Sequence, residues 1–287
     1  MSPRLQRALL IGSPAAMTLP AVGPAEAAIL ETFVVPRFLT LFGDAARSML
    51  LAGEAAYVAH LGCRTGYPDR DLLSALPNCA IVGIDSSAAA AELARNKAAT
   101  LPAADIQYLV AEGYPTSLEG NVFSHALSVY PLGPSALRKA LFLEMTRLLY
   151  SGGQAIVSLP MRGSFQELID LLNEYCLKYD DAELSARLEV ITTDRPTEET
   201  LTEELEDCGL AEVEIATATT HVTFDGGRAF VEDPTTRLLI IPDLLAVSRL
   251  DNLSGGLDYV RETVDKYWSE SQFALTVNIA VASARKP

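Results

Sequence analysis

The chain has 287 residues, of which 49% are hydrophobic and 21% charged, and its formal net charge is −15. This composition is typical of a globular protein, and the length allows one large domain. Because Lys and Arg form no cluster and no apolar run approaches the roughly 20 residues that span a bilayer, the sequence excludes nucleic-acid binding, docking on an anionic membrane and membrane insertion.

The first 24 residues are rich in Pro and Ala and predict a flexible N-terminal arm, followed by a single domain over 25–287. Gly12 and Pro14 interrupt the first apolar run too early for a signal peptide. The four cysteines form no C-x-x-C pair, and no His lies at metal-ligand spacing from them. We therefore expect reduced thiols, no metal site and a cytoplasmic protein.

Short apolar runs alternate with helical stretches through the first half of the chain. We predict strands over 57–61, 80–84, 106–110, 123–130 and 154–159, and helices over 70–75, 87–99 and 134–149. This alternation predicts βαβ units around a parallel sheet, and such a sheet binds ligands at the carboxyl ends of its strands.

The second half begins with a helical pattern over 165–179 and a helix over 198–208, with Thr197 as its N-cap and Gly209 just past its end. Strands are expected over 212–217 and 275–284, separated by a helical insertion at about 221–272 with helices over 236–250 and 257–269. The apolar stretch 230–247 offers a contact for a homodimer.

The negative charge is concentrated in one quarter of the chain. Residues 161–234 contain five basic and nineteen acidic side chains, and so hold fourteen of the fifteen excess charges. One interpretation is a solvated helical surface that keeps the protein soluble. The other is a docking surface for a protein partner with a basic surface, whose association would slow as salt rises.

Six segments in order resemble the class I S-adenosylmethionine-dependent methyltransferases, particularly the ubiquinone-biosynthesis-like type that acts on small molecules. They are 32–38 (TFVVPRF), 60–66 (HLGCRTG), 82–87 (VGIDSS), Glu112, 147–157 (RLLYSGGQAIV) and 200–213. The resemblance covers about 31–287. It implies a Rossmann-like doubly wound, seven-stranded sheet, mostly parallel with an antiparallel C-terminal hairpin and helices on both faces. It also implies a cap helix over 31–52, a cofactor-binding half over 55–160, and acidic helices and strands over 161–287.

The resemblance implies S-adenosylmethionine as cofactor and methyl transfer to a small-molecule acceptor. The cofactor-binding positions it implies are His60, Gly62, Arg64, Gly66, Asp85, Ser86 and Glu112. Asp85 would accept hydrogen bonds from ribose hydroxyls, or alternatively cap the following helix. Glu112 would contact the adenine edge, or alternatively be a solvated surface charge.

Three residues depart from the family pattern. His60 stands in place of an acidic residue, Arg64 in place of the middle glycine of the turn, and Ser124 in place of an aspartate. The first two changes add positive charge near the sulfonium and ammonium of the cofactor. They support an alternative in which the fold is catalytically inactive and serves as a binding or scaffold protein.

Methyl transfer is an in-line displacement that needs positioning first and a base second. The candidate bases are His125 and Tyr130, on or at the end of the fourth predicted strand, and His221, after the strand at 212–217. For each histidine the alternative is a structural or surface imidazole, and for Tyr130 it is packing in a pocket wall.

Overall fold

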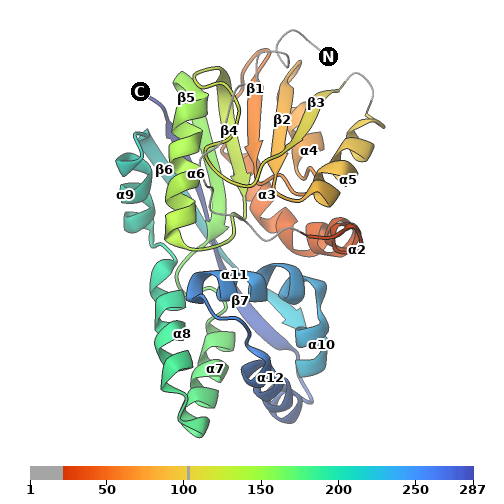
Figure 1. The fold of residues 1–287 in the computed structure, drawn as a ribbon, viewed down its shortest axis with the longest axis vertical. Helices are drawn as coiled ribbons and strands as arrows, with labels where there is room; N and C mark the ends of the chain where they lie inside the picture. Colours follow the sequence, from red (N-terminus) through yellow and green to blue (C-terminus); the bar gives the residue numbers. More distant parts are fainter. Residues whose placement is uncertain (1–21, 102–103) are drawn as a thin grey trace.

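The computed structural model describes residues 22–101 and 104–287, so the predicted arm lies almost entirely outside the described residues. Its centre is a seven-stranded sheet in the order β3-β2-β1-β4-β5-β7-β6 (Figure 1). The strands are β1 (Tyr57–Leu61), β2 (Ala80–Asp85), β3 (Asp105–Val110), β4 (Phe123–Val129), β5 (Leu149–Pro160), β6 (Ala211–Phe224) and β7 (Phe273–Arg285).

Strands β1 to β5 run parallel, whereas β7 is antiparallel to β5 and to β6. The central strands β1 and β2 are buried along their whole length, which explains why their sequences are continuous apolar runs and not alternating ones. The predicted doubly wound sheet with an antiparallel C-terminal hairpin is confirmed.

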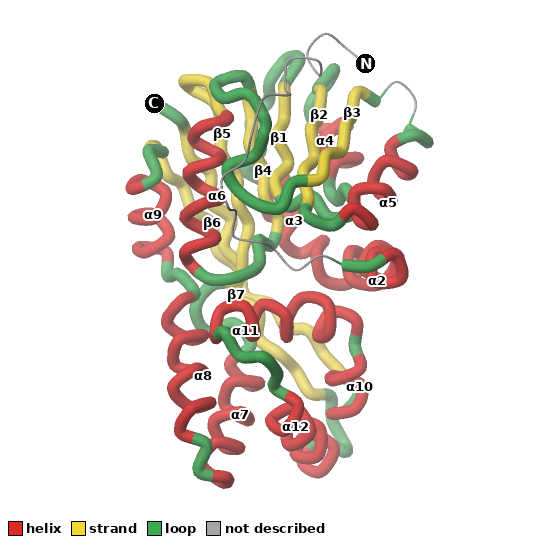
Figure 2. Tube along the Cα trace, in the orientation of Figure 1, coloured by secondary structure: helices red, strands yellow, loops and turns green. Residues whose placement is uncertain are grey.

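Helices surround this sheet, as Figure 2 shows in red. They are α2 (Pro24–Ile29), the π-helical η1 (Leu30–Leu39), α3 (Thr40–Ser48), α4 (Asp69–Ala75), α5 (Ala88–Ala98), α6 (Ser135–Leu148), α7 (Gln166–Tyr179), α8 (Ala182–Asp194), α9 (Glu198–Asp207), α10 (Gly227–Glu232), the π-helical η2 (Thr236–Ile240), α11 (Ile241–Ser248) and α12 (Ser254–Tyr267). None of the described helices is both long and apolar enough to cross a membrane.

Two large hydrophobic clusters hold the layers together. One joins η1, α3 and α4 to one side of the sheet and continues into the lower helices through Phe165, Leu168 and Phe230. The other packs α6 and α9 against the opposite side of the sheet, with Phe142 and Leu201 fully buried. Helices therefore cover both faces, and the carboxyl ends of the strands remain free to border a cleft.

The lower part of the molecule in Figure 1 is built around the far end of the β6–β7 hairpin. We predicted strand only over 212–217, but β6 continues to Phe224, because its Thr and Val residues pair with β7 throughout. The helices of the insertion therefore begin after Phe224, and His221 lies within the strand.

The apolar stretch 230–247 also differs from expectation. Its large side chains Phe230, Leu239, Ile240 and Leu244 are buried against the rest of the chain. These four side chains are therefore not available for a dimer contact, because they pack inside the large hydrophobic cluster of the same chain.

Candidate functional site

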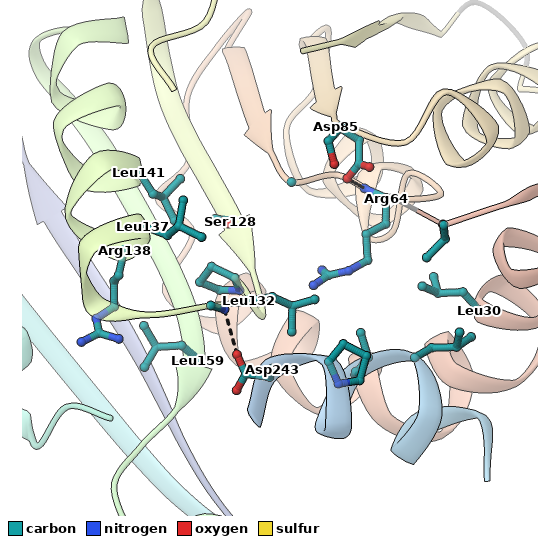
Figure 3. Close-up of a pocket in the computed structure, with 18 of the residues that line it drawn as sticks. Leu30, Arg64, Asp85, Ser128, Leu132, Leu137, Arg138, Leu141, Leu159 and Asp243 are labelled. Atoms are coloured by element: carbon teal, nitrogen blue, oxygen red, sulfur yellow. Dashed lines mark hydrogen bonds between the residues drawn. The ribbon is translucent and has the colours of Figure 1, made fainter. Parts of the chain in front are cut away.

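A cleft lies at the carboxyl ends of β1, β2 and β4, between the sheet and the helices below it (Figure 3). Gly62, Arg64, Asp85 and Ser86 line its upper side. Leu30 borders it from η1, and Leu239 and Asp243 border it from η2 and α11. The cleft therefore joins the half that we predicted to bind cofactor with the two segments that cover it.

The turn after β1 is shaped by three residues in the left-handed region. Gly62, Arg64 and Gly66 have φ of 71°, 47° and 79°. Gly66 leaves no room for a Cβ, which would collide with the ring of Tyr108, and it faces away from the cleft. Gly62 does line the cleft, so here the backbone itself forms the wall.

Arg64 extends its side chain into the open middle of the cleft (Figure 3). Its Nη1 donates to the carbonyl oxygen of Val129 at 2.8 Å, and its Nη2 donates to that of Tyr130 at 2.6 Å. Burial lowers the pKa of the guanidinium, partly offset by the charge of Asp85. Arg64, which stands where the resemblance implies a glycine, therefore bridges the ends of β1 and β4.

Asp85 is buried at the end of β2 and lines the cleft. Its Oδ2 accepts from the backbone N–H of Arg64 at 2.9 Å, and its Oδ1 accepts from that of Ser87 at 2.8 Å. The N-cap of α5 is Ser87, whose hydroxyl accepts from Ala90 N–H. The alternative in which Asp85 caps this helix is therefore wrong. Each carboxylate oxygen keeps a further lone pair for a ligand hydroxyl.

His60 and Glu112 do not line the cleft. His60 is fully buried, with its Nδ1 at 2.7 Å from Asp69 Oδ1, and Asp69 Oδ2 accepts from the Tyr108 hydroxyl at 2.7 Å. Glu112 is exposed. The wall near it is formed instead by Tyr114, whose pKa is raised by burial.

The three candidate bases are spread over the molecule. His125 lies near the amino end of β4, bonded to Ser124 Oγ at 2.8 Å and to the Leu51 carbonyl at 3.1 Å, and burial lowers its pKa. His221 is exposed on the edge strand β6. Tyr130 is fully buried and does not line the cleft: its carbonyl accepts from Arg64 Nη2, and its ring packs on Phe38 and Phe42.

Asp243, which the sequence reasoning missed, lies in the lower wall of the cleft (Figure 3). Its Oδ1 accepts from Gly133 N–H at 2.8 Å, and its Oδ2 accepts from Arg195 Nη2 at 3.2 Å. Burial raises its pKa, against the opposing effect of Arg195. The sequence does contain a signal for this residue, because Asp243 is the single charged residue in the apolar run 238–247.

The cleft wall also has apolar side chains, among them Leu132, Leu137 and Leu159, together with two further arginines, Arg138 and Arg237. Within the described ranges, no group of three or more His, Cys, Asp or Glu side chains could hold a metal ion. The four cysteines are free and buried. The arrangement thus offers a strand-end carboxylate, a guanidinium and an apolar surface in one cleft.

Comparisons with known proteins agree with this geometry. Residues 58–153 match the family model described as a methyltransferase domain. A search of curated proteins found no match. Among solved structures, the chain is similar to the YcgJ protein of Bacillus subtilis, at 11% identity and a TM-score of 0.55, covering 85% of this chain and 97% of that one.

Two further structures share the fold. One is phosphoethanolamine N-methyltransferase 2 of Haemonchus contortus in complex with S-adenosyl-L-methionine, at 14% identity and a TM-score of 0.53, over 93% of this chain and 60% of that one. The other is the [4+2]-cyclase SpnF, at 16% identity and a TM-score of 0.50, over 85% and 80%. The expected resemblance to the class I S-adenosylmethionine-dependent methyltransferases is confirmed: residues 58–153 match a methyltransferase-domain model, and the solved structures share the fold.

Proposed function

We propose that this protein transfers a methyl group from S-adenosylmethionine to a small, largely apolar acceptor bound in the cleft. The observation that carries the proposal is the position of Asp85. Its carboxylate stands at the end of β2, beside the turn at Gly62, in a cleft that also has an apolar wall. This is where open α/β sheets bind nucleoside ligands.

The residues at the upper wall fit the nucleoside part of the cofactor. Asp85 would accept from the ribose hydroxyls, Gly62 would allow close approach, and Ser86 and Tyr114 would border the base. When bound, the cofactor supplies an electrophilic methyl group on its sulfonium. Its amino-acid end would face Arg64, where a cation already stands, so the fit there is poorer.

The acceptor would lie against Leu132, Leu137 and Leu159, which exclude water from the methyl-transfer region. Asp243 faces the same space and would accept a hydrogen bond from the acceptor's reacting hydroxyl or amine. Positioning supplies most of the rate in such a displacement, and this cleft provides it with walls from η1, α11 and the loop after β4.

A binding titration and a transfer assay test the proposal together. Calorimetry with S-adenosylmethionine and S-adenosylhomocysteine should give dissociation constants on the order of micromolar, as working cofactor sites do. Methyl-labelled cofactor should then transfer its label to small apolar acceptors with a hydroxyl or amine. An absence of binding with cofactor at roughly 1 mM would reject the proposal.

The hydrogen bonds of Arg64 favour a second candidate, a catalytically inactive methyltransferase fold that binds a ligand or a partner. The guanidinium uses two carbonyls at the end of β4 and adds positive charge to the cleft. The likeness to a [4+2]-cyclase supports the view that this fold can serve chemistry other than methyl transfer. Tight nucleoside binding without label transfer to any acceptor would favour this candidate.

A further inference from the structure

Arg64 is a partly buried cation without a salt-bridge partner among the described residues. Its guanidinium has two carbonyl acceptors, but none of the salt bridges among the described residues includes it. Two buried arginines nearby are paired: Arg138 in the cleft wall with Glu204, and Arg195 behind the wall with Asp243. Arg237, also in the wall, is exposed to solvent. Carbonyl dipoles compensate a full charge only in part, so the guanidinium presents positive charge to the cleft, next to the carboxylate of Asp85.

Arg64 uses two carbonyl acceptors at the end of β4. The carbonyls of Val129 and Tyr130 lie at the carboxyl end of β4, next to β1 in the sheet. Asp85 lies at the end of β2, on the other side of β1. A nucleoside with its ribose on Asp85 would therefore extend its 5′ substituent toward the guanidinium.

Arg64 also holds a costly backbone conformation. Its φ of 47° is in the left-handed region, which glycine adopts freely and a long side chain does not. Tyr130, whose carbonyl accepts from Arg64, has φ of 52° as well. Two residues joined by a hydrogen bond at the border of the cleft are thus both held in this region, and such backbone strain recurs at functional sites.

We propose that the Arg64 guanidinium occupies the position where the positively charged end of the cofactor would lie. The cleft then binds nucleosides with an anionic 5′ substituent most tightly and uncharged nucleosides less tightly. It binds S-adenosylmethionine, with its sulfonium, least tightly. This inference rests on the proposed function only in placing a nucleoside at Asp85. It ranks ligands by charge and requires no methyl transfer.

Isothermal calorimetry with four adenosine ligands tests the ranking: S-adenosylmethionine, S-adenosylhomocysteine, adenosine and adenosine 5′-monophosphate. The native protein should bind S-adenosylhomocysteine about tenfold or more tighter than S-adenosylmethionine, and the monophosphate about tenfold tighter than adenosine. In Arg64→Gly both ratios should shrink, with S-adenosylmethionine gaining about tenfold in affinity and the monophosphate losing about as much.

Three variants keep the result interpretable. Arg64→Gly suits the positive φ and should fold, which a thermal melt checks. Arg64→Lys keeps the charge and should keep the native order of ligands. Arg162→Met is the matched control, because Arg162 also donates to two backbone carbonyls, those of Arg195 and Thr193, but outside the cleft. This variant should leave the affinities of all four ligands unchanged.

Unchanged ligand ratios in Arg64→Gly would overturn the inference, as would a failure of all four ligands to bind both proteins. The two proposals can fail separately. Micromolar S-adenosylmethionine binding that is insensitive to Arg64 would reject the inference and leave methyl transfer standing. Affinities that follow ligand charge, without transfer of the label to any acceptor, would support the inference and reject methyl transfer.

Discussion

At the scale of single residues, the positions at the strand ends were the part of the site that the sequence predicted. Asp85 follows the apolar run of β2, and a parallel sheet brings such positions to one edge, so its place in the cleft was predictable. The direction of Arg64 was not, because its acceptors Val129 and Tyr130 are 65 and 66 residues away in the chain. Because carbonyls distant in the chain fix the rotamer of Arg64, the local sequence does not predict it.

We predict that Asp85→Asn weakens S-adenosylhomocysteine binding by about 10- to 100-fold, because hydrogen bonds to a charged acceptor contribute about 1.5–3 kcal/mol. Calorimetry on the folded variant measures this. Glu112→Gln is the control, since Glu112 is exposed and outside the cleft wall. Equal losses in the two variants would show that charge alone, and not the position of Asp85, governs binding.

At the scale of elements, the sequence predicted most helices and strands, and α9 has the predicted cap at Thr197 and the positive-φ Gly209. It did not predict that α11 would border the cleft. That placement depends on a connection between distant segments: Arg195, just after α8, bonds Asp243 in α11, and Asp243 bonds Gly133 after β4. Hydrophobic periodicity predicts which face of a helix is buried, but not which element that face packs against.

We predict that Arg195→Met destabilises the protein by about 3–5 kcal/mol, because it leaves the Asp243 carboxylate buried without its partner. The side chains of Arg195 and Asp243 are 7% and 8% exposed, so solvent screens the pair little. Urea unfolding measures the change. The double variant Arg195→Met, Asp243→Asn should lose less than the single one, and a loss below about 1 kcal/mol in the single variant would contradict this account.

At the scale of the whole molecule, the acidic excess of 161–234 is partly used inside the fold. Glu204 pairs with Arg138, and Asp194 accepts from Ser135 at the start of α6. These contacts anchor the acidic helices to the half that we predicted to bind the cofactor. Composition located the excess but could not show which carboxylates would find partners. The docking of a basic protein on the remainder stays a prediction.

We predict that the fold loses stability at high pH. Burial raises the pKa of Tyr57 and of Tyr67 to about 12, from 10.0. The folded state therefore holds these protons more tightly than the unfolded state, so the stabilisation is complete below pH 10 and is lost as pH rises through about 12. Urea midpoints across this range measure it. The Tyr57→Phe, Tyr67→Phe variant should lose less, and identical pH profiles would contradict the assignment.

We infer above all that the cleft at the ends of β1, β2 and β4 is a nucleoside site. A crystal structure of the protein with S-adenosylhomocysteine tests it most directly. We expect ribose hydroxyls within hydrogen-bonding distance of Asp85 and the amino-acid end beside Arg64. A ligand bound elsewhere, or a ribose that makes no contact with Asp85, would contradict it.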